Sequence, residues 1–116
     1  DLHHADDRRA AGYLEYQRAR VRWFLSIDAS DLPERVRGHQ PTFRSIRYDD
    51  EEVEFSGGFT DLHTATYHHV LGGHGFGIED ARACIETVHD LRHQRPRPAP
   101  EHQAHPFLLE RIVPAT

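Results

Sequence analysis

"RVRWFLSID", residues 20–28, is the clearest indication of the fold in this sequence. Its apolar side chains alternate with polar or aromatic ones, Val21, Trp23, Leu25 and Ile27 against Arg20, Arg22, Phe24 and Ser26. A period of two is typical of a strand with two different faces. The segment before it, GYLEYQ, is rich in aromatic residues and can pair with it antiparallel, with residues 18–20 near the turn. We therefore predict a β-hairpin over residues 12–28.

The next segments predict a second hairpin and a helix. TFRSIRY (residues 42–48) and EVEF (residues 52–55) flank Asp49-Asp50, which suits a turn. Residues 60–71 then have helical spacing of their larger side chains, and Thr60 or Asp61 can cap the helix. Gly72-Gly73 predicts its end, because glycine accepts the left-handed conformation found there.

A second helix is predicted over residues 79–93, with an apolar stripe that we expect to face the core: Ala81, Cys84, Ile85, Val88 and Leu91. Its first turn is acidic and its last turn basic, which matches the helix dipole. Residues 96–116 form a proline-rich tail that we expect to be extended, with FLLERIV at residues 107–113 as a strand-like end. Strands first and helices later predict an α+β fold, an antiparallel sheet with helices packed on one face.

Composition limits the class of protein. The 116 residues fit one small domain, and a net charge of −5 argues against a nucleic-acid partner. No apolar run approaches the roughly 20 residues of a membrane span, and the polar N-terminus suits neither a signal peptide nor a natural start. One cysteine excludes an internal disulfide and is compatible with the cytoplasm. All 14 basic residues are arginine, so a reaction that needs lysine cannot be completed by this chain.

The histidine-rich stretch TYHHVLGGHGF, residues 66–76, raises the possibility of a metal site. His68 and His69 are adjacent and point about 100° apart on a helix, and the HExxH pattern is absent. We therefore favour surface histidines on a helix that ends in a glycine turn, and predict no metal site. GHGFG, residues 73–77, follows a helix and lacks the full dinucleotide fingerprint, so we expect a helix–helix connection there. Cys84, on the apolar stripe, is predicted to be a small buried hydrophobe.

Arg18, Arg20 and Arg22 are the strongest candidates for a binding site. Arg20 and Arg22 share one face of the predicted strand, and Arg18 lies across the turn. Three clustered guanidinium groups suit an anion such as a phosphate or a carboxylate. A solvated edge or a subunit contact is the alternative interpretation, and the residues alone leave both open.

Three segments in order, GYLEYQRARVRWFLSID, TFRSIRYDDEEVEFSGGFTDLHTATY and GFGIEDARACIETVHDLR, resemble the C-terminal part of the Gfo/Idh/MocA oxidoreductases. The similarity covers roughly residues 10–95. It is greatest to the branch that oxidises UDP-N-acetylglucosaminuronic acid at the sugar 3-position, in the biosynthesis of bacterial surface polysaccharides. The resemblance implies that residues 1–95 are a substrate-side and oligomerisation domain of a longer enzyme. The NAD-binding domain and the catalytic residues would lie outside this chain, which contains no cofactor site and no catalytic residue of its own.

The resemblance also implies roles for four residues. The turn that carries Arg18 and Arg20 approaches the substrate in the family, so these arginines would contact the pyrophosphate or the uronate of a UDP-sugar. Thr60 and His63 would open a helix on the active-site side, where a helix N-terminus can face an anion. A merely capped helix start is the alternative. We expect the face of Val21 to pack on helices, and the other face to meet a second subunit in a homo-oligomer.

The function predicted from the sequence is therefore the substrate-binding and oligomerisation domain of an NAD-dependent nucleotide-sugar dehydrogenase, cytoplasmic and inactive alone. Two rival hypotheses belong to other classes. One is a stand-alone binding or assembly module without catalysis, and the other is a histidine-based metal protein. A chain indifferent to UDP-sugars and monomeric would contradict the first two, whereas one tightly bound equivalent of zinc or nickel would support the third.

Overall fold

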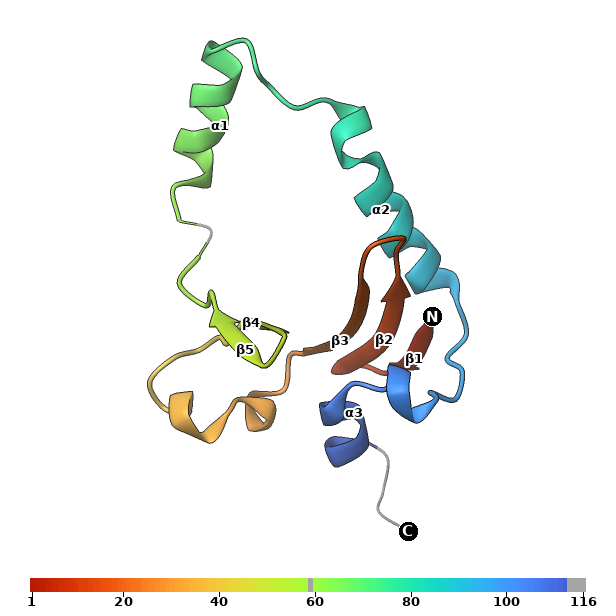
Figure 1. Ribbon diagram of the computed structural model, residues 1–116. Helices are drawn as coiled ribbons and strands as arrows, with labels where there is room; N and C mark the ends of the chain where they lie inside the picture. Colours follow the sequence, from red (N-terminus) through yellow and green to blue (C-terminus); the bar gives the residue numbers. More distant parts are fainter. Residues whose placement is uncertain (59, 113–116) are drawn as a thin grey trace. The chain divides into compact units, whose positions relative to one another are not determined.

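The computed structural model describes residues 1–58 and 60–112 and has the predicted α+β fold, with antiparallel sheets and three α-helices in this part of the chain (Figure 1). The strands are β1 (Leu2–Ala5), β2 (Arg9–Glu15), β3 (Arg20–Ser26), β4 (Ser45–Tyr48) and β5 (Glu51–Glu54). The α-helices are α1 (Leu62–Leu71), α2 (Ile78–His93) and α3 (Pro106–Arg111). Short 3-10 helices lie at Ala29–Asp31, Glu34–Val36 and Glu101–Gln103. The chain forms two compact units, Asp1–Asp31 with the chain from Thr87 onward, and Leu32–Glu86.

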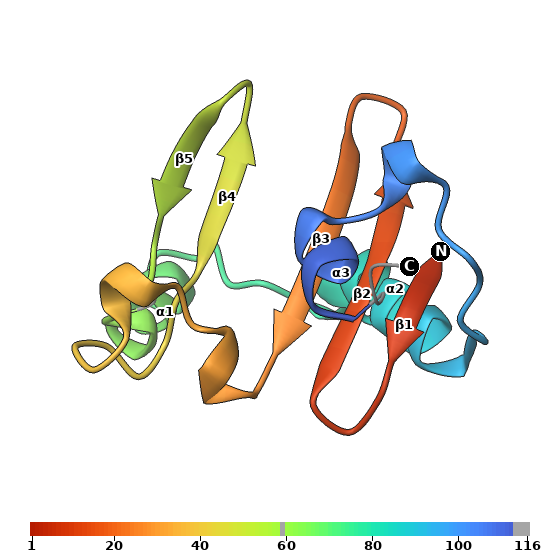
Figure 2. The same cartoon turned by 90° about the horizontal axis from the view of Figure 1, so that it is seen from below.

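The first unit is built on a three-stranded antiparallel sheet with the order β1-β2-β3 (Figure 2). β2 and β3 pair without interruption from Arg9↔Ser26 to Glu15↔Arg20, which confirms the hairpin predicted from the alternation in residues 20–28. Strand β1 was not predicted from the sequence. Its residues LHHA show no clear alternation, and the irregularity between Leu2 and His4 interrupts its register with β2.

The core of this unit lies on the opposite face of β3 from the one we predicted. Ala11 and Phe24 are cross-strand partners, so their side chains share a face of the sheet. Ala11 is fully buried there with Ala104 and Leu108, and Phe24 packs against this cluster. On the other face, Leu25 is 66% exposed. The prediction that the face of Val21 packs on helices is therefore wrong for α3, which covers the face of Phe24. Leu2, which pairs with Gly12 on the side of Trp23, is buried as well.

The tail provides the layer that covers this face, and part of it is helical. Residues 107–112 of the segment predicted as strand-like fall in or next to α3, so that prediction is wrong; Val113 lies outside the described residues, as do positions 114–116 of the predicted tail. Pro106 occupies the first turn, where its missing N–H has no intrahelical partner to lose. The His105 side chain accepts a hydrogen bond from the Phe107 N–H at 3.1 Å and caps the helix. Figure 2 shows α3 over β2 and β3.

The second unit contains the β4–β5 hairpin, which confirms the prediction for residues 42–55. Its turn residues Asp49 and Asp50 have φ values of 45° and 66°. Positive φ at both central residues matches the twist of a two-residue hairpin, and aspartate tolerates it better than most residues. The guanidinium of Arg35 lies 3.1 Å from a Glu52 carboxylate oxygen and 5.0 Å from the ring centroid of Phe43, which ties the preceding loop to the hairpin.

Helices α1 and α2 confirm the two predicted helices, but neither buries a residue. Of the predicted apolar stripe of α2, Ile85 and Val88 are 65% and 50% exposed, whereas Leu91 near its C-terminal end is half-buried. Cys84 is exposed as well, and its predicted burial is wrong. None of the helices in residues 1–58 and 60–112 is long and apolar enough to cross a membrane.

We expect acid to weaken the attachment of α3 through His105. Burial, and secondarily the charge of Arg22, lower the pKa of His105 below its ordinary 6.5, although Glu110 opposes this. Its Nδ1 must be unprotonated to accept the Phe107 N–H, so the folded chain binds fewer protons than the unfolded chain just below pH 6.5. The stabilisation that neutral His105 provides is complete above pH 6.5, and it is lost as the pH falls through the lowered pKa. We expect a loss of about 1 kcal/mol, typical of an N-cap.

The measurement is the free energy of urea unfolding between pH 5 and 8, as a span around the ordinary histidine pKa of about 6.5. His105→Asn keeps an acceptor at the N-cap but removes the titration, and should flatten the profile. In this variant the free energy of unfolding should still depend partly on pH, because burial also lowers the pKa of His3. His102→Asn, at an exposed neighbouring position, is the control and should retain the full slope. Equal slopes in the wild type and both variants would contradict the role of His105.

Candidate functional site

The tip of the β2–β3 hairpin carries the two arginines predicted to bind substrate. Glu15 and Arg20 form the last cross-strand pair, and the Tyr16 N–H donates to the Ala19 carbonyl at 2.8 Å across the connection that contains Arg18. The Arg20 Nε lies 3.4 Å from a Glu15 carboxylate oxygen. The side chains of Arg20 and Glu15 are 77% and 62% exposed. The tip is therefore open to a ligand, and the binding role of Arg18 and Arg20 stays a prediction.

The charge of this tip favours an anion. Residues 15–22 contain three arginines and one carboxylate, that of Glu15. Arg22 pairs with Tyr13, two positions from the Glu15↔Arg20 pair, so Arg20 and Arg22 share a face as predicted. Glu15 was not singled out from the sequence. Its place opposite Arg20 follows from the register, which alternation alone does not fix. An arriving anion would compete with Glu15 for the guanidinium of Arg20.

A second group of charges lies at the other end of the same two strands and is closed. The Asp31 carboxylate accepts from Arg9 Nε at 2.6 Å, from Ser26 Oγ at 2.6 Å and from Arg111 at 3.1 Å. Burial alone would raise the pKa of Asp31, but the hydrogen bonds from Arg9, Ser26 and Arg111 outweigh it and lower the pKa. Because its donors are internal and its side chain is 7% exposed, this cluster holds the fold together and is not available to a ligand.

Thr60 and His63 lie in the other compact unit, at the start of α1. Both are exposed, and His63 is in the first turn of the helix. Asp61 occupies the N-cap position with a left-handed φ of 58°, and its side chain makes no capping hydrogen bond. The sequence predicted a cap by Thr60 or Asp61. Asp61 takes the N-cap position, but its side chain does not cap the helix, which begins at Leu62. The substrate-binding roles of Thr60 and His63 stay predictions.

The histidine-rich stretch forms a helix with a glycine stop, as predicted. The Gly72 N–H donates to the His68 carbonyl at 3.0 Å, and Gly73 has a left-handed φ of 76°. The His74 N–H then donates to the His69 carbonyl at 2.8 Å, which directs the chain toward α2. The glycine-rich segment thus joins two helices and does not form the strand-to-helix turn of a dinucleotide site. Among residues 1–58 and 60–112, no three side chains of histidine, cysteine, aspartate or glutamate converge on a common point.

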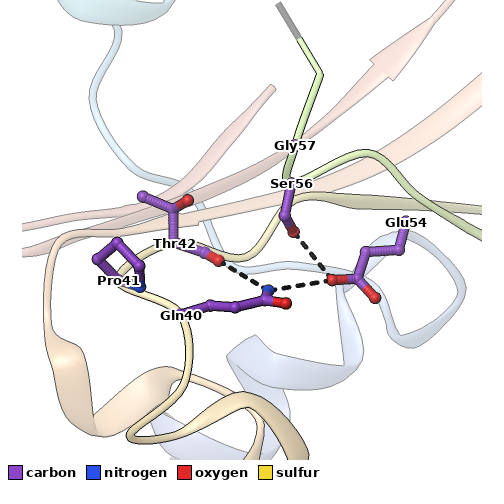
Figure 3. Close-up of a pocket in the computed structure, with 6 residues that line it drawn as sticks. All are labelled: Gln40, Pro41, Thr42, Glu54, Ser56 and Gly57. Atoms are coloured by element: carbon purple, nitrogen blue, oxygen red, sulfur yellow. Dashed lines mark hydrogen bonds between the residues drawn. The ribbon is translucent and has the colours of Figure 1, made fainter.

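An open hollow of about 390 Å³ lies beside β5 in the second unit and is lined by Gln40, Pro41, Thr42, Glu54, Ser56 and Gly57 (Figure 3). The Gln40 amide donates to Glu54 at 3.2 Å, and the Ser56 hydroxyl donates to the same carboxylate oxygen at 3.1 Å. These polar groups therefore satisfy one another. The carboxylate gives the hollow the wrong sign for an anionic ligand, so we do not assign a substrate to it.

Two solved structures resemble this chain closely, both of the WlbA (WbpB) dehydrogenase from Thermus thermophilus. The structure in complex with NAD and α-ketoglutarate has 48% sequence identity and a TM-score of 0.87. The structure in complex with NAD and UDP-GlcNAcA has 46% identity and a TM-score of 0.86. Each match covers 93% of this chain but 35% of the dehydrogenase chain, so this chain spans about a third of the length of its relatives. A scan against protein-family models finds no match.

Proposed function

The chain belongs to the dehydrogenases of the Gfo/Idh/MocA type, as a part of their C-terminal region, and from this we propose that it is the substrate-side domain of an NAD-dependent UDP-sugar dehydrogenase. The observation that carries the proposal is 46% identity, over 93% of this chain, to a dehydrogenase solved with NAD and UDP-GlcNAcA. We propose oxidation of UDP-N-acetylglucosaminuronic acid at the sugar 3-position, for surface polysaccharide synthesis in the cytoplasm.

In this proposal NAD supplies the hydride chemistry from another part of the enzyme. The glycine-rich segment of this chain does not form a dinucleotide fingerprint, because it joins α1 to α2 and does not connect a strand to a helix. The chain also contains no lysine to act as a base. Its own contribution is to bind and orient the sugar nucleotide and to keep water from the reacting centre. Alone, the chain is expected to be inactive.

Arg20 and Arg18 are proposed to bind the anionic part of the UDP-sugar. Their support is the exposed cationic tip and the ability of a guanidinium to hold a phosphate or a carboxylate by two parallel hydrogen bonds. An exposed ion pair such as Arg20–Glu15 contributes about 0–1 kcal/mol, so a doubly charged pyrophosphate can displace Glu15 from it. Thr60 and His63 are proposed to contribute from the start of α1, where the Asp61 side chain makes no capping bond.

The proposal predicts opposite effects for the two partners at the hairpin tip. In the intact enzyme, Arg20→Ala should weaken UDP-GlcNAcA binding by about 1.5–3 kcal/mol, the range of a lost charge-assisted hydrogen bond. Glu15→Gln should tighten it slightly, because the competing carboxylate is removed. Steady-state kinetics of NADH formation from NAD⁺ and UDP-GlcNAcA, with calorimetric binding of the UDP-sugar, would measure both effects.

Arg47→Ala removes the same charge from an exposed position on β4 and should leave the Michaelis constant unchanged. If the intact enzyme forms no NADH with UDP-GlcNAcA, the proposed substrate is wrong. If it is active but Arg20→Ala has the Michaelis constant of the wild type, only the role of Arg20 is wrong. The two failures are therefore distinguishable.

We also propose that the parent enzyme is a homo-oligomer that uses the sheet face left uncovered by α3. Val21, Leu25 and Ile27 on or next to this face are 38%, 66% and 83% exposed. Contiguous apolar side chains of this kind are typical of protein interfaces. A stand-alone assembly module would use the same surface without catalysis, and the kinetic assay on the intact enzyme separates the two functions.

A further inference from the structure

Two histidines near the C-terminal end of α2 lie one helical turn apart. Residues 89–93 have the sequence HDLRH, which places His89 and His93 at positions i and i+4 on one face of the helix. Their ring centroids are 4.2 Å apart, and the ring planes are inclined by 29°. This pair was not among the sites predicted from the sequence, which concerned the histidines of residues 66–76.

The hydrogen bonds of the pair leave one nitrogen of each ring available. The Nδ1 of His93 lies 2.7 Å from the His89 carbonyl oxygen, and since a carbonyl only accepts, Nδ1 is assigned as the donor. In neutral imidazole the Nε2 of His93 then carries the lone pair. The Nδ1 of His89 faces the Asp90 carboxylate at 3.5 Å, which favours the same tautomer in His89. In metal-binding histidines, the ring nitrogen that does not bind the metal usually donates a hydrogen bond to an oxygen, which fixes the orientation of the ring.

From this juxtaposition we propose that His89 and His93 together bind one divalent late transition-metal ion, such as Ni²⁺ or Zn²⁺, through their Nε2 atoms. Imidazole nitrogen suits these ions. Two nitrogen ligands of a tetrahedral ion, each about 2.0–2.1 Å from the metal, stand roughly 3.3 Å apart. The ring centroids are 4.2 Å apart, so the rings are close enough to share one ion once they turn out of their stacked arrangement to direct both Nε2 lone pairs at it.

The site is accessible, and water completes the coordination. The side chains of His89 and Asp90 are 66% and 72% exposed, and α2 has no buried residue. A third protein ligand is not at hand in the described residues, so the site is a two-histidine chelate. The adjacent histidines 68 and 69 differ, because their side chains diverge by about 100° around the helix.

The proposed site lies just before the segment that joins α2 to strand β1. Gln94, directly after the helix, accepts a hydrogen bond from the Leu2 N–H at 3.1 Å, and the Arg97 N–H donates to the Leu2 carbonyl at 2.9 Å. A chelate across residues 89 and 93 fixes the last helical turn, from which these contacts to β1 continue.

The test is calorimetric titration of the full chain, free of any affinity tag, with NiCl₂ and separately with ZnCl₂. We expect a phase near one equivalent that weakens at least tenfold in His89→Ala and in His93→Ala, since each variant loses the chelate. His68→Ala is the matched control and should stay within about twofold of the wild type. Alanine favours the helix at these exposed positions, and circular dichroism verifies that each variant folds.

A second measurement identifies the site directly. Substoichiometric Ni²⁺ should broaden the NMR amide signals of residues 86–97 first in the wild type, and not in His93→Ala. The proposal is overturned if the wild type has no phase near one equivalent, if that phase survives in both variants, or if His68→Ala weakens it equally. It is also overturned if the signals broadened first belong to another segment.

Discussion

Replacing Asp31 with asparagine should lower the free energy of unfolding by about 2–4 kcal/mol. The buried carboxylate receives hydrogen bonds from Arg9, Ser26 and Arg111, and Arg111 also donates to the Asp31 backbone carbonyl at 2.8 Å. Asparagine keeps the shape but removes the carboxylate that both guanidinium groups share, and only Arg9 retains a second one, Asp28, at 3.6 Å. Removing one member of a buried ion pair costs about 3–5 kcal/mol, and we expect somewhat less because both arginine side chains are 24% exposed.

The effect should depend on pH in a defined direction. The hydrogen bonds hold the pKa of Asp31 below its ordinary 3.8, so the contribution of the carboxylate is complete above that pH. It is lost as pH falls through the lowered pKa, and the stabilities of the wild type and the variant should converge in acid. Urea unfolding at neutral and acidic pH measures this convergence.

Asp28→Asn is the matched control. Asp28 bonds to Ser30 and to Arg8, whose side chain is 68% exposed, and its own side chain is 18% exposed against 7% for Asp31. It also lies 3.6 Å from Arg9, but it receives no hydrogen bond from Arg111 among the described contacts. The loss of stability should be clearly smaller than for Asp31→Asn. Because Arg111 belongs to α3, the Asp31 variant should also release that helix, which proteolysis after Arg111 would detect. Equal losses at the two aspartates would refute the central role of Asp31.

The second large effect is expected for Gly12→Ala, a loss of about 3 kcal/mol, at the upper end of the range for overpacking. A β-carbon at Gly12 would overlap the Asp1 carbonyl oxygen and would lie 2.6 Å from Cζ2 of the Trp23 indole. The indole is half-buried, and the carbonyl is held by the Tyr13 N–H at 2.8 Å. The substitution must therefore disrupt the pairing of β1 with β2 or displace the Trp23 indole from its position.

Gly57→Ala tests whether the loss is specific. A β-carbon at Gly57 meets nothing within 4 Å, and its φ is not in the left-handed region. We expect a change of less than about 0.5 kcal/mol there, as at most surface positions. Thermal unfolding, with near-ultraviolet circular dichroism of Trp23 as the probe, measures both variants. A wild-type signal and melting temperature in Gly12→Ala would contradict the close packing of β1 on the indole.

The elements that the sequence predicts correctly carry their signal locally. The β2–β3 hairpin follows from the alternation in residues 20–28, the second hairpin from its Asp49-Asp50 turn, and α2 from its helical stripe and charged ends. The segments predicted wrongly or missed depend on packing. FLLERIV is apolar enough for a strand, but Pro106 and the cap of His105 set a helix that closes the core over Ala11.

The candidate site could be predicted only in part. The sequence indicates that Arg20 stands near a turn, but the register that opposes Glu15 to it is a property of the paired strands. The cluster around Asp31 cannot be derived from sequence spacing, because it joins residues 80 positions apart. The hydrogen bond of His93 cannot be derived either, because it depends on a side-chain rotamer. Which face of β3 is covered likewise depended on a helix that the sequence did not indicate.

The β2–β3 hairpin separates its structural charges from its exposed ones along a single ladder. At the Arg9↔Ser26 end the charges are buried and bonded to Asp31, whereas at the Glu15↔Arg20 end they are solvated and only loosely paired. Substitutions at the tip therefore leave the buried hydrogen bonds at the Arg9↔Ser26 end of the hairpin intact. This arrangement makes the hairpin evolvable, since the preference of its tip for one anion over another can drift between descendants while the fold is inherited unchanged.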